Sequence, residues 1–127
     1  MDLTRIAPTD RQHIQKYTSG GFTVSGIAYA GPVLVFPKAS QSWDVKDSAG
    51  LCEVDFAKVI EASGEIDLCL LGCGSRMTLV PSDLKKALRD AGIGIEPMDT
   101  GAACRTFNVL LAEGRAVMAA LLPPGPA

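Results

Sequence analysis

The chain has 127 residues, of which 47% are hydrophobic and 20% are charged, and its formal net charge is −2. This length allows one domain with a substantial core, and the hydrophobic content excludes a disordered chain. The sequence pI of about 5.3 argues against nucleic acid as a general partner, because such binding needs a basic surface.

No apolar run reaches the length that a bilayer-spanning helix needs. The first residues show neither a secretion signal nor an arginine-rich transit segment. We therefore expect a cytoplasmic protein without a membrane span, for which peripheral contact with a membrane stays open.

The chain divides into three parts by composition. Residues 1–16 are polar, with scattered charge and a proline, and predict a flexible N-terminal arm. Residues 17–122 predict a single α/β domain. Residues 123–127, with the sequence Pro-Pro-Gly-Pro-Ala, cannot continue a strand and predict a frayed tail.

The first part of the domain predicts strands. Residues 22–29 alternate between apolar and polar side chains, as a half-buried strand does, and Gly26 is the expected site of a bulge. Residues 33–36 form a second apolar run, and the short link predicts that the two strands pair as an antiparallel hairpin. Residues 41–43 predict a third, minor strand. We expect Trp43 in this strand to pack in the core, with one hydrogen-bond partner for its indole N–H.

Helices and strands alternate in the rest of the domain. Residues 52–62 carry apolar side chains at helical spacing, and the short apolar run 66–71 suits a strand that is covered on both faces. The Gly72-Cys73-Gly74 segment predicts a tight turn. The helix that follows begins at Pro81, where a missing N–H costs nothing, and stops at Gly92.

The C-terminal third repeats this alternation. Residues 93–97 predict a short strand that its own proline ends. Asp99 or Thr100 can cap the next helix, which stops at Gly114, and residues 116–122 form a last buried strand. Strands that alternate with helices are joined by right-handed crossovers. We therefore predict an α/β fold in which three neighbouring strands run roughly parallel.

Arginines follow two strands of this predicted sheet. Arg76 and Arg105 both come after strand ends, and loops after parallel strands gather along one sheet edge. One interpretation is a small-anion site or a protein-binding patch; the other is structural, with Arg105 pairing with Asp99 or Glu96 to fix the turn. The residues favour neither. The candidate binding patch consists of Gly72, Gly74, Ser75, Arg76, Glu96, Asp99, Thr100, Cys104, Arg105, Thr106 and Asn108.

The pair Gly72-x-Gly74 after a strand is also half of a dinucleotide-binding fingerprint, in which glycines let a pyrophosphate approach a helix N-terminus. Glu96 would then stand where a ribose-binding acid is expected. Met77, however, occupies the third glycine position, and 127 residues leave little room for a full dinucleotide fold. A structural turn is therefore favoured, and no cofactor is expected.

Four cysteines and one histidine limit the chemistry. Cys52, Cys69, Cys73 and Cys104 are irregularly spaced, which predicts reduced and mostly buried thiols. Cys104 lies near a predicted helix N-terminus, but the only histidine, His13, is in the predicted arm, so a cysteine–histidine nucleophile is disfavoured. We therefore expect no catalytic residue and no metal site, and lean against an enzyme.

Two blocks of the sequence resemble a known family. The first joins Leu71-Gly72-Cys73-Gly74 to Pro81 and to Ala91-Gly92-Ile93; the second, more specific block runs from Glu96-Pro97-Met98-Asp99-Thr100 through Ala103-Cys104-Arg105-Thr106-Phe107-Asn108 to Glu113-Gly114-Arg115. With Phe22, Gly26, Tyr29, Gly31 and Trp43 upstream, residues 17–122 resemble the small α/β family that includes the mitochondrial assembly factor three of NADH:ubiquinone oxidoreductase (complex I). Cys73 departs from the family pattern, in which many relatives have threonine.

The resemblance implies a three-layer fold, with a central mixed sheet, helices and a smaller N-terminal β-hairpin layer. It also implies a non-catalytic role in assembling a membrane-bound respiratory complex, with subunits of that complex as protein partners. The alternative is a small-anion or nucleotide-binding protein, or an enzyme, that uses a crevice at residues 72–77. Because an exposed edge strand invites pairing with another chain, the sequence is compatible with a monomer and with a homodimer.

Overall fold

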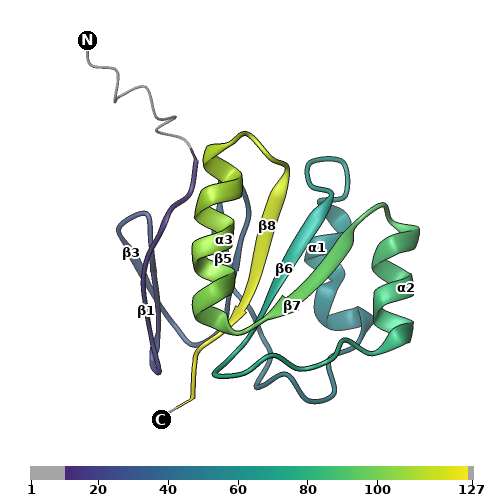
Figure 1. Ribbon diagram of the computed structural model, residues 1–127, viewed down its shortest axis with the longest axis horizontal. Coiled ribbons are helices and arrows are strands. Elements are labelled where there is room, and N and C mark those ends of the chain that lie inside the picture. The colour runs from purple at the N-terminus through teal and green to yellow at the C-terminus, as the bar shows by residue number, and fades with distance from the viewer. Residues whose placement is uncertain (1–10, 126–127) are drawn as a thin grey trace.

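A computed structural model describes residues 11–125 of the chain. Five strands form a central sheet in the order β5-β4-β8-β6-β7, and three more form a small sheet in the order β1-β2-β3 (Figure 1). The elements are β1 (Ile14–Thr18), β2 (Gly21–Val24), β3 (Ile27–Ala30), β4 (Val33–Val35), β5 (Ser40–Ser42), the 3₁₀ helix η2 (Glu53–Phe56), α1 (Ala57–Glu61), β6 (Leu68–Cys73), α2 (Ser82–Asp90), β7 (Gly94–Met98), α3 (Thr100–Ala112) and β8 (Val117–Leu122).

Strand β6 lies at the centre of the parallel part of the sheet. It pairs in parallel with β7 on one side and with β8 on the other, so that Leu68 stands opposite both Gly94 and Val117. Strand β4 continues the sheet antiparallel to β8, and β5 pairs antiparallel with β4. The predicted parallel strands and the predicted mixed sheet are confirmed. The carboxyl ends of β6, β7 and β8 meet at one edge of the sheet, which we call the carboxyl edge.

Strand β8 is buried along its whole length, which explains its continuous apolar sequence. Its alternate side chains supply two separate cores. Leu121 packs in one core cluster with Phe107 of α3, whereas Met118 packs in the other with Phe56 of η2 and Leu88 of α2. The central sheet therefore separates α3 from η2, α1 and α2.

The small sheet lies beside α3 (Figure 1). Ile14, Phe22 and Val24 point inward and join the core cluster that contains Phe107. The molecule thus has three layers: η2 with α1 and α2, then the central sheet, then α3 with the small sheet. This confirms the three-layer α/β fold with a smaller N-terminal β layer.

The predicted hairpin between residues 22–29 and 33–36 is wrong. Ser25 and Gly26 have positive φ angles, 49° and 85°, as a two-residue type I′ turn requires. They split the first run into the hairpin of β2 and β3. Val33–Val35 instead enters the central sheet as β4, between β5 and β8. The apolar alternation continued through the turn and concealed this break.

Three boundaries also differ from the prediction. The predicted arm ended at residue 16, but β1 already begins at Ile14. Gly72 and Cys73 belong to β6, so the chain turns only at Gly74, whose φ is 95°. Pro97 lies inside β7 rather than after it. A proline fits there because β7 is an edge strand, in which one row of N–H groups has no strand to pair with.

The predicted helices are present. Helix α2 begins directly after Pro81, its N-cap residue, and Gly92 follows its end with a φ of 83°. The predicted helix over residues 52–62 is divided into η2 and α1. Trp43 is buried, meets Phe56 edge-on with ring centroids 5.4 Å apart, and donates from Nε1 to Asp55 O at 2.8 Å, as predicted.

The predicted arm and tail both extend beyond the described residues. Residues 1–10 and 126–127 are not described, so the flexible arm and the frayed tail stay predictions. Within residues 11–125, no helix combines the length and the apolar character needed to cross a membrane.

Candidate functional site

Thr100 joins three elements at the carboxyl edge. It is the first residue of α3 and is completely buried. Its Oγ1 donates to Leu122 O at 2.6 Å and accepts from Gly74 N at 2.8 Å, and its N–H donates to Gly74 O at 2.8 Å. Asp99 caps the helix, as predicted, because its Oδ2 accepts from Ala102 N at 3.0 Å. Both side chains therefore serve the fold, by holding the ends of β6 and β8 against the start of α3.

Gly72 is required by packing at the same place. A Cβ at this position would lie 2.8 Å from Leu121 Cδ2 and 3.2 Å from Thr100 Cα. Helix α3 can approach β6 this closely only because residue 72 has no side chain. These contacts occupy the space over Gly72, so the half fingerprint Gly72-x-Gly74 has a structural explanation, as the sequence favoured.

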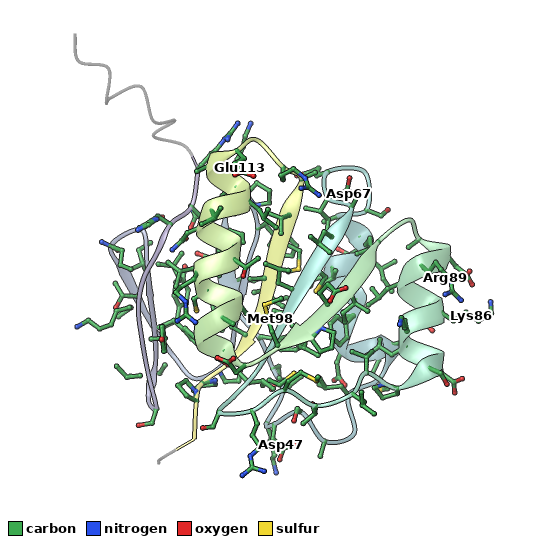
Figure 2. The ribbon with its side chains drawn as sticks, viewed as in Figure 1. Asp47, Asp67, Lys86, Arg89, Met98 and Glu113 are labelled. Atoms are coloured by element: carbon green, nitrogen blue, oxygen red, sulfur yellow. The ribbon has the colours of Figure 1, made fainter. Side chains whose placement is uncertain are left out.

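A groove of about 450 Å³ opens beside Gly74. Its walls are the loop that precedes η2, the start of the loop between β6 and α2, and the residues after β8. Lys46, Asp47, Ser75 and Arg76 are among the residues that line it. Asp47 marks this end of the molecule in Figure 2. Three residues of the predicted patch, Gly74, Ser75 and Arg76, therefore lie in one groove.

Arg105 is exposed on α3, and Tyr17 of β1 lies beside it. A Cβ on Gly101 would be 2.7 Å from the Tyr17 hydroxyl and 3.2 Å from Arg105 Nη1, so the two side-chain ends meet above Gly101. Within residues 11–125, Arg105 forms an ion pair with neither Asp99 nor Glu96. The pairing that the structural interpretation required is therefore absent from this part of the chain, and the guanidinium is accessible.

Two other predicted residues of α3 face inward. Asn108 Oδ1 accepts from Ile14 N, and Asn108 Nδ2 donates to Ile14 O, both at 2.9 Å. Arg11 Nη1 donates to Leu111 O, at 2.7 Å, farther along the helix. Cys104 is buried in the core cluster between α3 and the small sheet. Asn108 therefore fastens β1 to α3, and Cys104 fills the space beneath.

Glu96 lies apart from the groove at the carboxyl edge. It is exposed on β7 and lines a second groove, of about 410 Å³, with Lys85 and Arg89 of α2. Thr106 is partly buried on α3. The predicted patch is thus divided among a groove, the exposed side of α3, the edge of the sheet and the interior of the fold.

Burial keeps two thiols protonated. Burial raises the pKa of Cys69 and that of Cys104 from 9.0 to about 12, and for Cys104 the nearby Arg105 only partly opposes this effect. A thiol with such a pKa is not a nucleophile near neutral pH. All four cysteines are free, and three are buried, as predicted. In the described part of the chain, no three His, Cys, Asp or Glu side chains gather as metal ligands.

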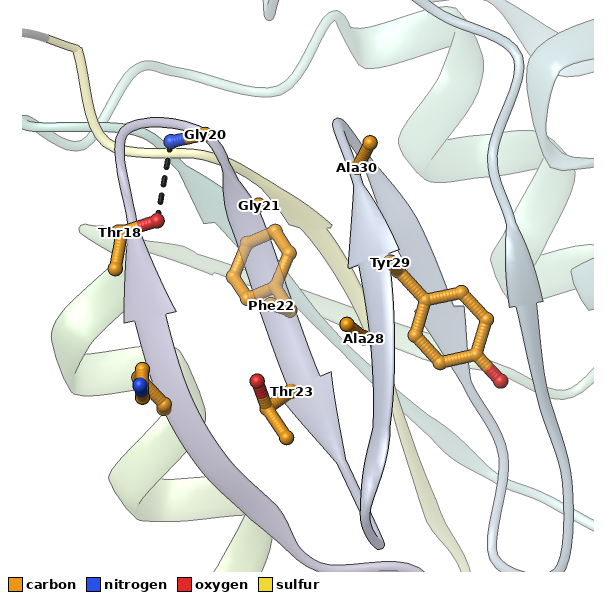
Figure 3. Close-up of a pocket in the computed structure, with 9 residues that line it drawn as sticks. Thr18, Gly20, Gly21, Phe22, Thr23, Ala28, Tyr29 and Ala30 are labelled. Carbon is orange, nitrogen blue, oxygen red and sulfur yellow. Dashed lines mark hydrogen bonds between the residues drawn. The ribbon is translucent and has the colours of Figure 1, made fainter.

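The small sheet carries a shallow depression of about 400 Å³ that the sequence did not indicate (Figure 3). Small side chains such as Thr23 and Ala28 line it, together with Lys16. Gly21 is required there, because a Cβ would collide with Tyr29 O. None of the predicted site residues lines this depression. Its only signal in the sequence was the small residues, which are also typical of turns.

Solved structures share this fold. The crystal structure of an outer membrane protein from Bartonella henselae superposes on this chain with a TM-score of 0.84 and 34% sequence identity. The match covers 91% of this chain and 98% of the Bartonella chain. A crystal structure from Bordetella parapertussis has a TM-score of 0.82 and 31% identity, with the same coverage. A Bordetella pertussis protein, whose solution NMR structure is described as a Mth938-like domain, has a TM-score of 0.78 and 26% identity. The match covers 95% of this chain and 90% of the Bordetella pertussis chain.

Related sequences extend over most of the chain. NADH dehydrogenase (ubiquinone) 1 alpha subcomplex assembly factor 3 of Homo sapiens is 34% identical over 126 residues, which are 95% of this chain and 68% of the relative. An uncharacterized protein of Rhodobacter capsulatus is 38% identical over 113 residues, covering 88% of this chain and 86% of the relative. The model of a protein family of unknown function, DUF498/DUF598, matches residues 14–122. The chain belongs to this family, which confirms the resemblance found in its sequence.

Proposed function

We propose that the chain is a non-catalytic protein-interaction factor that assists the assembly of a respiratory NADH dehydrogenase complex. It recognises subunits of that complex, acts in the cytoplasm and contacts membranes at most peripherally. The observation that carries the proposal is the 34% identity, over 95% of this chain, to a protein named as an assembly factor of NADH dehydrogenase.

The surface of the molecule supports a role in binding. Arg76 and Arg105 are exposed and form no ion pair or hydrogen bond within the described part of the chain. The side chain of Leu79 is 86% exposed. In contrast, Cys69 and Cys104 are held as protonated thiols by burial. Exposed arginines are enriched in protein-binding surfaces, and an exposed leucine offers apolar area that a partner can cover.

Co-purification tests this proposal. The tagged chain is expressed in its own cells, the membranes are solubilised gently, and bound proteins are quantified by mass spectrometry against a tag-only control. We expect enrichment of NADH dehydrogenase subunits. A folded, well-expressed chain that enriches none of them overturns the proposal.

The groove at the carboxyl edge supports a second candidate, a small-anion or nucleotide-binding protein or an enzyme. Lys46 and Arg76 line this groove of about 450 Å³, and an anion would neutralise both. A thermal-shift panel of nucleotides and phosphorylated metabolites tests this candidate. A specific ligand at 100 times its dissociation constant stabilises the fold by about 2.7 kcal/mol, and Arg76→Ala should abolish that gain. A panel without any shift removes the candidate.

A further inference from the structure

Two large apolar side chains stand out from the loop between β6 and α2. Met77 is 51% exposed and Leu79 is 86% exposed. Between and after them, Thr78 lines the groove at the carboxyl edge, and Val80 packs against the core cluster on the α2 side. Thr78 is itself exposed, but it and Arg76 line the groove whereas Met77 and Leu79 do not. Alternate residues of this segment therefore face the groove and face away from it, as in an extended backbone. We call Met77 and Leu79 the apolar ridge.

The backbone under the ridge is fastened at both ends. Before it, Gly74 exchanges two hydrogen bonds with the buried Thr100. After it, Pro81 is the N-cap of α2. Thr78 O also lies 3.9 Å from Cys73 Sγ, whose single proton can donate either to it or to Leu71 O at 3.7 Å. The two ends of the segment that carries the ridge are therefore fixed, which reduces the number of conformations that a partner must order when it binds.

The groove beside the ridge has an excess of free positive charge. Lys46 and Arg76 line it, and neither forms an ion pair or a hydrogen bond within residues 11–125. The carboxylate in the groove, Asp47, accepts a hydrogen bond from Ala49 N at 2.9 Å and so stabilises its own loop. Unpaired cations next to exposed apolar side chains are complementary to a partner that carries acidic and apolar groups side by side.

We propose that the groove and the apolar ridge bind an extended segment of a partner protein in which acidic and bulky apolar side chains alternate. The acidic side chains contact Lys46 and Arg76, and the apolar ones cover Met77 and Leu79. Alternation follows from the extended ridge, because an extended segment presents every second residue to the same side. The inference rests on the proposed function, since it identifies the surface with which the chain recognises its partner.

An anionic membrane would also attract exposed cations and leucine. The structure favours a peptide, because the cations line a groove rather than a flat surface, the carboxylate of Asp47 in the same groove would repel lipid phosphates, and the chain as a whole carries a net charge of −2. Vesicle binding is therefore the contrary result in the test below.

The test uses short synthetic peptides of alternating leucine and glutamate, labelled with a fluorophore, and the full-length chain. Binding is measured by fluorescence polarisation at low and high salt. Peptides with lysine in place of glutamate are the matched control, and vesicles of phosphatidylglycerol are assayed in parallel. We expect saturable binding of the acidic peptide that weakens as salt screens the charges, and no binding of the lysine peptide or the vesicles.

Variants locate the site. Arg76→Glu should weaken binding of the acidic peptide by about fivefold. The control is Arg89→Glu, which changes an exposed arginine of α2 outside this groove and should leave binding unchanged. Leu79→Ser should weaken it by a similar factor, whereas Val54→Ser, which changes a side chain that is 75% exposed on η2, should not. Circular dichroism confirms that each variant is folded.

The outcomes separate this inference from the proposed function. The proposed peptide-binding groove is overturned if the acidic peptide does not bind or if it binds Arg76→Glu as tightly as the wild-type chain. It is also overturned if the chain binds the vesicles and not the peptide. The proposed function still stands in that case, provided that the wild-type chain enriches NADH dehydrogenase subunits. If the peptide binds as expected but no NADH dehydrogenase subunit is enriched, the peptide-binding groove is supported and the proposed assembly role is overturned.

Discussion

Thr100 and Gly74 are joined by hydrogen bonds in both directions. Gly74 N–H donates to Thr100 Oγ1, and Thr100 N–H donates to Gly74 O, both at 2.8 Å. The same hydroxyl donates to Leu122 O at 2.6 Å. One buried side chain thus satisfies the backbone at the ends of two parallel strands, and it does so where the loop that carries the candidate site begins.

Replacing this hydroxyl should destabilise the fold. Thr100→Val keeps the shape of the side chain but leaves Gly74 N–H and Leu122 C=O without their partner in a buried place. We expect a loss of about 2–6 kcal/mol in the free energy of unfolding, because each of the two buried unsatisfied groups costs about 1–3 kcal/mol. Urea denaturation measures this loss. Thr106→Val, on the same helix but partly exposed, is the control; a loss as small in Thr100→Val as in this control contradicts the role of the hydroxyl.

The close approach of α3 to β6 predicts a second effect. A methyl group at Gly72 would meet Leu121 Cδ2 at 2.8 Å and the Thr100 backbone at 3.2 Å. Gly72→Ala should therefore cost about 1–3 kcal/mol of unfolding free energy, as overpacking does. Gly94→Ala is the matched control in β7, where the nearest atoms lie 3.8 Å away. Equal midpoints of urea denaturation for the two variants would refute the packing argument.

The sequence predicted the parallel half of the fold because the signals there are local. Asp99 caps α3, and Pro81 and Gly92 bound α2, each through an interaction within its own helix. The other half depends on contacts that are distant in sequence. Ile14 pairs with Asn108, which is 94 residues away, and Val33 pairs with Leu121. Neither apolar alternation nor turn residues specify such partners.

The site was predictable in part for the same reason. The sequence named Arg76 and Arg105 because loops after parallel strands meet at one edge; the structure places Arg76 in the groove and Arg105 on α3, outside the lining of the groove. Thr100 and Asn108 were also named, but a polar residue on a helix that follows a strand looks the same in the sequence whether its side chain binds a ligand or a distant backbone group. Lys46 was missed, because its place in the groove depends on how a loop outside the parallel part folds back to the carboxyl edge.

The attachment of the small sheet to α3 depends on Asn108. Its amide group makes two hydrogen bonds of 2.9 Å to the backbone of Ile14. Asn108→Ala should therefore lower the free energy of unfolding by about 1–3 kcal/mol and speed amide hydrogen exchange in β1 more than in β6. Val109→Ala, next to it and exposed, serves as the control. Unchanged exchange in β1 would show that other contacts hold the sheet in place.

The raised thiol pKa values predict a dependence of stability on pH. Folding raises the pKa of Cys69 and of Cys104 from 9.0 to about 12. Between these values the unfolded chain releases protons that the folded chain retains. The stabilising contribution is therefore complete below pH 9 and is lost as the pH rises toward 12, at up to about 1.4 kcal/mol per pH unit for each cysteine.

Cysteine variants isolate this contribution from other groups that titrate at alkaline pH. The free energy of unfolding is measured by urea denaturation at several pH values from 9 to 12. Cys104→Ala should show a shallower fall than the wild-type chain, whatever its stability at neutral pH. Cys52→Ala, which removes the exposed thiol, should keep the wild-type slope. Identical slopes in all three proteins would mean that Cys104 ionises as readily when it is folded as when it is unfolded.

Arg105 predicts an effect on partner capture without an effect on folding. Its guanidinium is exposed and forms no ion pair within residues 11–125, so Arg105→Ala should leave the unfolding midpoint within experimental error. If Arg105 contacts an acidic group of the partner, the variant should recover about two- to fivefold less of the NADH dehydrogenase subunits in co-purification, as expected for an exposed charge pair.

Arg115→Ala is the matched control for Arg105→Ala. Arg115 is also exposed but follows the C-terminal end of α3, whereas Arg105 lies on α3 itself, with its Nη1 close to Gly101 in the first turn. A docking surface that extends from the groove at the carboxyl edge onto α3 requires that the first substitution reduces capture and the second does not. If both variants recover as much of the subunits as the wild-type chain does, the docking surface is restricted to the groove and the apolar ridge. Equal loss with both would instead indicate long-range attraction between net charges, which a rise in salt concentration should then remove.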